Sequence, residues 1–206
     1  VHAADGRLLA EYARERRVFV PVKAMPRRVI KAFLAAEDKT FYSHFGLDLT
    51  GLARAVVTNL SQLGTGKRPV GASTITQQVA KNFLLSNEVS IARKAKEAIL
   101  ALRIERALSK DRILELYLNQ IYLGKRSYGV AAAALNYFDK SLDSLTIAEA
   151  AYLAALAKGP SNYHPIRRYD AAITRRNWVL GQMARNQFIT AAEAAAAKKA
   201  PLIATG

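Results

Sequence analysis

Apolar residues recur every three or four positions over most of this chain, and that spacing predicts helices. After Pro26 the apolar positions follow this period up to Glu37 and Asp38, so a first helix should carry Glu37 at its C-terminal end. Residues 49–63 and about 88–108 should form two further helices. Four more should begin at residues that can cap a helix, and should run from Thr74 to Leu85, from Ser109 to Tyr122 with Gly124 as the stop, from Thr146 to Gly159, and from Thr190 to Pro201.

The first 25 residues follow a different pattern. β-Branched and aromatic residues are frequent between Arg7 and Val22, and Asp5-Gly6 is a turn signal, so a short β arm is expected there. The segment 64–69 is glycine-punctuated and basic, a composition typical of a mobile loop. We therefore predict one mainly α domain over residues 1–206, with two lobes around a cleft and an N-terminal arm over residues 1–25.

Composition limits the classes of partner and site that this domain can have. Lys and Arg number 31 against 16 Asp and Glu, a net charge of +15 that would attract nucleic acid, anionic lipid or a phosphorylated substrate. The absence of cysteine excludes disulfides and thiolate metal sites. No apolar run of about 18 residues occurs, so no segment of this sequence is expected to span a bilayer.

The first candidate site lies where the first helix ends. Glu37, Phe41 and His44 are spaced i, i+4, i+7, and Asp38 follows Glu37 directly. A carboxylate shielded by Phe41 and Tyr42 would have a raised pKa, as a general base requires. The simpler interpretation is a pair of solvated acids at a helix end.

A second group lies on the helix that begins at Thr74. Thr74, Gln78 and Lys81 fall on one helical face, near a helix N-terminus whose free N–H groups attract anions. Such a face suits a phosphate and the hydroxyls of a sugar. An ordinary capped amphipathic helix would show the same pattern.

Two further pairs are one helical turn apart. Arg93 and Glu97 are spaced i, i+4 amid further cations, which indicates either an anion site or a routine surface ion pair. Glu115 and Asn119 lie in a helix that is apolar nearly all round, so they should be buried and need partners inside. We expect these two residues to have a structural role.

Taken together, the chain resembles the peptidoglycan glycosyltransferases of glycosyltransferase family 51, the transglycosylase domains of class A penicillin-binding proteins and their monofunctional relatives. The resemblance covers nearly the whole chain. It is carried by four motifs in family order, at residues 37–46, 71–82, 93–97 and 116–124.

That resemblance implies a lysozyme-like helical fold and an enzyme that polymerises lipid II, inverting the anomeric centre and releasing undecaprenyl pyrophosphate. Glu37 would be the base that takes the proton from the 4-hydroxyl of the incoming lipid II, and Glu97 matches the second essential carboxylate. The remaining motif positions would contact or shape the substrate site: Asp38, Phe41, His44, Thr74, Gln78, Lys81, Asn82, Arg93 and Lys96. Among these, Lys81, Arg93 and Lys96 would hold the pyrophosphate, whose developing charge calls for cations.

The same resemblance sets expectations about metal, membrane and partners. No cofactor is required, although Mg²⁺ or Mn²⁺ bridging Glu97 to the phosphates would be compatible with the pattern. The segment at about 49–70 corresponds to a mobile, membrane-proximal part of the family, and Val56, Val57, Leu60 and Leu63 would either meet lipid or pack in the core. The expected location is the extracytoplasmic (periplasmic) face of the bacterial cytoplasmic membrane. A transmembrane anchor and a transpeptidase domain are expected elsewhere in the parent protein.

Two other functions fit part of the pattern. A lysozyme-like hydrolase or lytic transglycosylase would use a raised-pKa acid to cut glycan strands, but it has no evident need for converging cations. A basic helical nucleic-acid-binding module would explain the charge, but the basic residues are scattered along the helices and form no concentrated recognition face. We therefore expect no nucleic-acid partner.

Overall fold

The computed structural model describes residues 16–62, 71–83 and 90–205, and this part of the chain is mainly helical, as predicted. Its α-helices are α1 (Arg27–Glu37), α2 (Leu49–Ser61), α3 (Ile75–Phe83), α4 (Ile91–Ala107), α5 (Lys110–Gln120), α6 (Val130–Phe138), α7 (Ile147–Leu156), α8 (Tyr169–Arg185) and α9 (Ala191–Lys199). Short 3-10 turns lie at Val22–Ala24, Phe41–Ser43, Leu142–Ser144 and Pro160–Tyr163.

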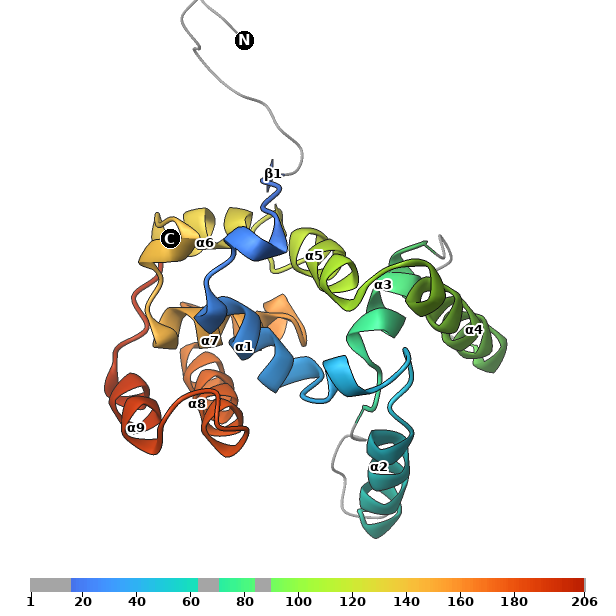
Figure 1. The fold of residues 1–206 in the computed structure, drawn as a ribbon. Helices are drawn as coiled ribbons and strands as arrows, with labels where there is room; N and C mark the ends of the chain where they lie inside the picture. The colour runs from blue at the N-terminus through green and yellow to red at the C-terminus, as the bar shows by residue number, and fades with distance from the viewer. Residues whose placement is uncertain (1–15, 63–70, 84–89, 206) are drawn as a thin grey trace, which may run out of the picture.

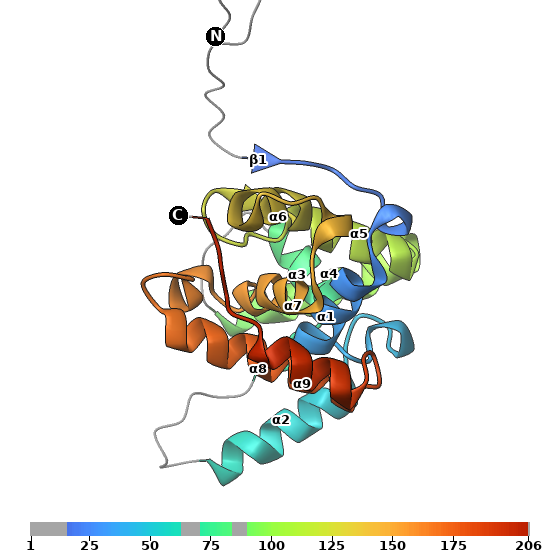
Figure 2. The same cartoon turned by 90° about the vertical axis from the view of Figure 1, so that its left-hand side faces the viewer.

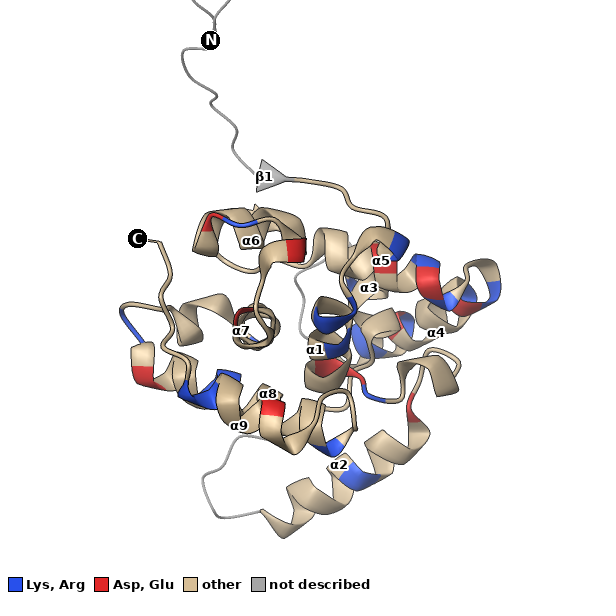
Figure 3. Ribbon diagram, turned by 60° about the vertical axis from the view of Figure 1, so that its left-hand side comes forward, with Lys and Arg blue, Asp and Glu red and all other residues tan. Residues whose placement is uncertain are grey.

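Helix α7 is the centre of the larger group of helices. Its sequence is apolar almost all round, and a helix of that kind is stable only when other elements cover it. Nearly every residue from Ala148 to Leu156 is buried. Figure 3 shows α7 nearly end-on, with α1, α6 and α8 around it, and Figure 2 shows the same group from another side. Helix α1 is thus held on α7 and α8, and its C-terminal end has a fixed position.

A second group consists of α3, α4 and α5, with α3 packed against both of the others. Helix α2 stands apart from both groups at the lower right of Figure 1. Only Ala55 of α2 is buried, whereas most of its large apolar side chains are exposed. Near α2, the two groups are in contact where the end of α1 meets the start of α3, through hydrogen bonds from Ile75 to Asp38 and from Gln78 to Glu37.

The N-terminal arm is tied to α5 and to a second short strand. Strand β1 (Arg16–Arg17) pairs in parallel with β2 (Ser127–Tyr128). The predicted β arm is therefore present at Arg17, whereas the expected strand residues before position 16 lie outside the described residues. The chain then leaves the strand, because Asn119 binds the backbone of Val20 and Glu115 binds that of Val22.

The predicted caps hold, but several predicted helix ends lie too far along the chain: α7 ends at Leu156 and not at Gly159, and α9 ends at Lys199 and not at Pro201. Capping boxes are present at Thr146 and Thr190, and Ser109 caps α5. Helix α5 ends at Gln120 and not at Tyr122, because residues 121–123 turn away to bond with residues 127–129. Pro26 is the N-cap of α1, so the helix begins directly after it, at Arg27.

Candidate active site

Glu37 is the last residue of α1, and the backbone leaves the helix at Asp38 with φ −160° and ψ 77°. The two acids therefore point to different surroundings. Gln78 of α3 donates a hydrogen bond from Nε2 to Glu37 Oε2 at 3.0 Å. Oε1 of Glu37 accepts no hydrogen bond from a described residue, so one oxygen of this carboxylate is left for another donor.

Burial raises the pKa of Glu37, and the negative charge of Asp38 adds to that effect. The hydrogen bond from Gln78 and the positive charges of Arg175 and Lys158 oppose it. The sequence predicted a raised pKa from shielding by Phe41 and Tyr42. The direction is confirmed, but Tyr42 is 54% exposed and donates to Asp111. A carboxylate with a raised pKa has the proton affinity that a general base needs near neutral pH.

Asp38 is almost fully buried, 6% exposed, and its hydrogen bonds hold the neighbouring segments together. Its carboxylate accepts from His44 Nε2 at 3.0 Å and from the backbone N–H of Ile75, at the start of α3, also at 3.0 Å. His44 Nδ1 accepts from the N–H of Gly46 at 3.2 Å, which places the imidazole proton on Nε2, facing Asp38. Asp38 thus joins the end of α1 to the following turn and to α3.

Phe41 lies beneath this turn, fully buried. Its ring meets those of Tyr42 and His44 edge-on, and Lys110 Nζ sits 4.4 Å from its centre. Lys110 in turn donates to Glu105 at 2.7 Å. Phe41 therefore shapes the site by supporting the loop that holds His44.

Thr74 is a helix cap, as predicted, and the structure also places it beside the first motif. Its hydroxyl donates to the carbonyl of Gly46 at 2.6 Å and accepts from the N–H of Gln77. The Gln77 side chain accepts from the N–H of Thr74, which completes a capping box. These contacts fix the first turn of α3, from which Gln78 reaches Glu37.

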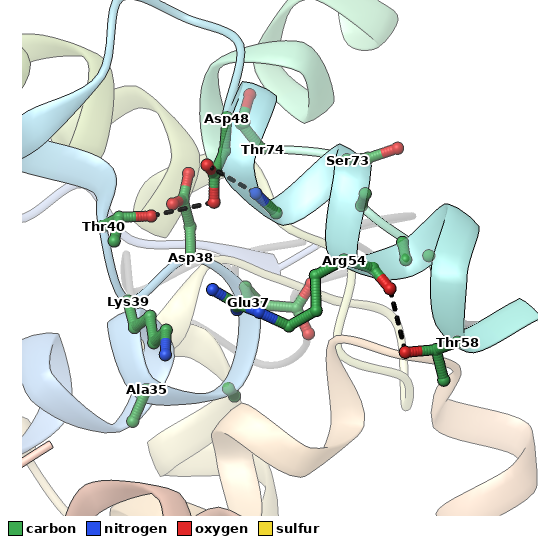
Figure 4. A pocket seen from close by; sticks show the side chains of 15 residues that line it. Ala35, Glu37, Asp38, Lys39, Thr40, Asp48, Arg54, Thr58, Ser73 and Thr74 are labelled. Atoms are coloured by element: carbon green, nitrogen blue, oxygen red, sulfur yellow. Dashed lines mark hydrogen bonds between the residues drawn. The ribbon is translucent and has the colours of Figure 1, made fainter.

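A pocket of about 200 Å³ opens beside Glu37, between the end of α1, helix α2 and residues 71–74. Figure 4 shows Arg54 extending from α2 into this pocket on the side of Glu37, with Lys39 on the opposite wall. Asp48 and Thr74 also line it. The cations that line the pocket are therefore Lys39 and Arg54, which the sequence analysis did not select.

Glu97 forms a second buried acidic centre, 2% exposed. Lys94 Nζ lies 2.7 Å from its Oε2, and Arg93 Nε lies 3.5 Å from its Oε1. Lys94 also donates to Ser73 at 2.9 Å, and Ser73 lines the pocket. Glu97 is thus connected to the pocket edge through Lys94. Two cations beside one carboxylate are a poor setting for a divalent metal, and the described residues contain no cluster of three or more potential metal ligands.

The remaining predicted residues lie further along the same helices. Lys81 and Asn82 are exposed in the last turn of α3, and Lys96 is exposed on α4. Lys81, Arg93 and Lys96 do not line the pocket. Glu115 accepts from the N–H of Val22 at 2.8 Å, and Asn119 binds both backbone groups of Val20, so both side chains hold the arm.

Sequence reasoning missed Arg54, Lys158 and Arg175. Arg54 carried a usable signal, since it is the single charged residue in α2. Lys158 and Arg175 carried none. They come from the turn after α7 and from α8, and only the packing of α1 on these helices brings their charges near Glu37.

The chain matches known proteins over almost all of its length. A family model described as Transglycosylase matches residues 5–184. Penicillin-binding protein 1A of Rickettsia felis is 52% identical over 203 residues, which cover 98% of this chain and 26% of that protein. Penicillin-binding protein 1A of Neisseria lactamica is 51% identical over 190 residues, 92% of this chain and 23% of that protein.

A solved structure agrees with these matches. The crystal structure of penicillin-binding protein 1A from Haemophilus influenzae aligns with a TM-score of 0.58 and 32% sequence identity, over 99% of this chain and 20% of that one. The chain therefore spans about a quarter of the length of the curated relatives that it matches.

Proposed function

The chain belongs to the transglycosylase family of peptidoglycan glycosyltransferases, and from this premise we propose that it polymerises lipid II with Glu37 as the general base. Glu37 would take the proton from the 4-hydroxyl of the incoming lipid II. That oxygen would attack the anomeric carbon of the growing strand, and the bond to undecaprenyl pyrophosphate would break with inversion.

The arrangement of the two neighbouring carboxylates carries this proposal. Glu37 has a raised pKa and one oxygen without a donor among the described residues, so it can accept a proton from a substrate. Asp38 is buried and already accepts from His44 and Ile75. A glycan-cleaving hydrolase needs two working carboxylates across the scissile bond, and Asp38 is engaged while Glu97 is paired with cations. The geometry therefore favours transfer over hydrolysis.

The pyrophosphate would meet cations on both sides of the pocket. Arg54 and Lys39 line it, and Lys94 reaches its edge at Ser73. Lys81, Arg93 and Lys96 lie beyond, along α3 and α4, where a substrate longer than the pocket would extend. Since the leaving group is a weak base, such charges stabilise it without a strong acid. We propose no step through a metal, because Glu97 is a poor ligand while Arg93 and Lys94 flank it.

The membrane would lie against α2. Leu49, Leu52, Val56, Val57 and Leu60 of this helix are between 50% and 70% exposed, which is unusual for a helix in water. Leu63 lies outside the described residues. In the part of the chain that the structure describes, no helix has the length and apolar character needed to cross a membrane. We propose that α2 rests on the lipid surface at the extracytoplasmic (periplasmic) face and that the parent protein supplies the anchor and a transpeptidase domain.

The direct test is polymerisation of radiolabelled lipid II in detergent. Glu37→Gln removes the base and should abolish polymer, with a loss of at least about a hundredfold. Asp143→Asn, an exposed carboxylate in a 3-10 turn, is the matched control and should polymerise at the unmodified rate. Burial disfavours the charge of Glu37, so Glu37→Gln should melt no lower than the unmodified protein. Polymer formation by Glu37→Gln at the unmodified rate would rule out Glu37 as the base.

A further inference from the structure

Three tyrosines are almost completely buried, and one of them differs from the other two. Tyr137 is 1% exposed and donates to the carbonyl of Leu123 at 2.9 Å, and Tyr152 is 0% exposed and donates to the carbonyl of Tyr163 at 2.9 Å. Tyr117 is 1% exposed, and its hydroxyl has no hydrogen-bond partner among the described residues. A buried hydroxyl without a partner destabilises a fold, and Phe would avoid that penalty at the same volume.

The position of Tyr117 suggests why a hydroxyl is present. Tyr117 lies on α5 with its ring edge-on to Phe33 of α1, at 6.3 Å between ring centres. Burial, followed by the negative charges of Glu37 and Asp38, raises the pKa of Tyr117 well above its ordinary value. The hydroxyl therefore keeps its proton and can only donate to a carboxylate. Phe33 and Glu37 are four residues apart on the same face of α1, so the ring contact with Phe33 places Tyr117 beside the face that carries Glu37.

Of the four carboxylate oxygens of these two acids, only Glu37 Oε1 accepts no hydrogen bond from a described residue. Asp38 Oδ1 faces His44 Nε2, and Asp38 Oδ2 faces both His44 Nε2 and the N–H of Ile75. Glu37 Oε2 accepts from Gln78, whereas Oε1 accepts from no described residue. A hydrogen bond from Tyr117 would therefore go to Glu37.

We propose that Tyr117 is a positioning residue for Glu37, and that its hydroxyl donates to the Glu37 carboxylate through one internal water in the free protein and directly when substrate fills the site. Hydrogen bonds in active sites often tighten only in the complex with substrate. Gln78 and Tyr117 would then hold the carboxylate from two helices, α3 and α5. This inference rests on the proposed role of Glu37 as the base.

A series of three Tyr→Phe variants tests it. In Tyr117→Phe the polymerisation rate should fall about tenfold with KM within about twofold, while the melting temperature stays equal or rises. Tyr137→Phe and Tyr152→Phe each lose a hydrogen bond to a backbone carbonyl, so they should melt about 2–4 °C lower and keep their rate within about twofold. An unchanged rate in Tyr117→Phe would overturn the inference. So would a rate loss accompanied by a melting temperature as low as that of the other two variants.

A second measurement separates this inference from the proposed function. Glutamate carboxyl carbons labelled with ¹³C can be titrated by NMR, with the Glu37 resonance assigned from its absence in Glu37→Gln. A donor to the ionised form favours that form, so Glu37 should titrate at higher pH in Tyr117→Phe than in the unmodified protein, and Tyr137→Phe should not change it. An identical titration in Tyr117→Phe would refute the contact. A shifted titration in a protein that does not polymerise lipid II would uphold the contact and refute the proposed function.

Discussion

Glu37 is subject to opposing electrostatic effects. Burial raises its pKa, and Gln78, Arg175 and Lys158 lower it. Arg175 is held in place by Trp178, with the guanidinium carbon 3.9 Å from the ring centre, a distance typical of a cation–π contact. Burial also lowers the pKa of Arg175 itself, although its ordinary value is so high that it stays charged. Arg175 is thus a fixed positive charge that favours ionised Glu37.

Removing this charge should change the pH dependence of the reaction. Arg175→Met would raise the pKa of Glu37, because Arg175 lowers it, and the acid limb of the rate profile should move to higher pH. On that limb the rate should fall about tenfold, and at alkaline pH it should recover to within about twofold. The measurement is the pH profile of lipid II polymerisation.

Two variants make this result interpretable. Arg175→Lys keeps the charge and should keep most of the profile. Arg185→Met removes an Arg from the last turn of the same helix, ten residues and about 15 Å further along, and should leave the profile unchanged. If Arg175→Met and Arg185→Met gave the same profile as the unmodified protein, Arg175 would have no part in tuning Glu37.

At this scale the sequence identified the acids better than their surroundings. Glu37 and Asp38 stood out because adjacent acids followed by aromatics are unusual at a helix end. The sequence did not show that Glu37 keeps an open oxygen while Asp38 is engaged in hydrogen bonds. That difference depends on the backbone turning at Asp38 and on the N–H of Ile75 lying nearby. The hydroxyl of Tyr117 was equally hidden, since an aromatic residue in an apolar helix usually belongs to the core.

The helices that meet at the site are joined by Asp38. Asp38→Ala would leave the backbone N–H of Ile75 and the imidazole Nε2–H of His44 without acceptors. The loss should cost about 2–4 kcal/mol of stability for the two donors together. The first turn of α3 should then open more often. Amide hydrogen exchange should become faster at Ile75, with a lower melting temperature.

Asp48 provides the matched comparison, because its carboxylate accepts from the N–H of Gly51 in the first turn of α2. Asp48→Ala should accelerate exchange at Gly51, not at Ile75, and cost about 1 kcal/mol as the loss of a half-buried cap. Unchanged exchange at Ile75 in Asp38→Ala would show that α3 does not depend on this contact.

Helices with clear start signals were predictable, and helices without them were not. Thr146 and Thr190 form the capping boxes that their sequences indicated. Helix α6 was missed because its sequence, VAAAALNYF, has almost no polar face and follows Gly129, which provides no side-chain cap. Helix α8 was missed because Arg168 precedes it and no side chain caps its N-terminus. Packing on α7 stabilises both helices without a local signal.

For the molecule as a whole, the sequence indicated an attraction to anionic surfaces but not the face involved. Figure 3 shows Lys and Arg distributed over several helices. The exposed apolar side chains of α2 are the basis for the orientation proposed above, and their exposure could not be foreseen because helical spacing alone does not say which side a neighbour covers. Core packing and lipid contact were therefore equally compatible with the sequence.

This orientation can be tested with vesicles. Val57 is 67% exposed on α2, and Val57→Glu should weaken binding to phosphatidylglycerol vesicles about tenfold, because one apolar side chain leaves the lipid and a charge takes its place. Ile203→Glu is the control, since Ile203 is 77% exposed close to the C-terminus of the chain. In Figure 1 the C-terminus and α2 lie on opposite sides of the molecule. Equal loss of binding in both variants would refute a specific role for α2.

The contacts of Asn119 and Glu115 with the arm also fix the alignment of the arm relative to α5. Asn119 pairs with Val20 and Glu115 with Val22, so Pro21 lies between the two anchor points. A slip of the arm by one residue in one direction would bring Pro21 opposite Asn119, and a slip in the other direction would bring it opposite Glu115. Proline has no N–H to donate, so a shift in either direction loses a hydrogen bond between the arm and α5. Pro21 therefore disfavours both shifted alignments of the arm.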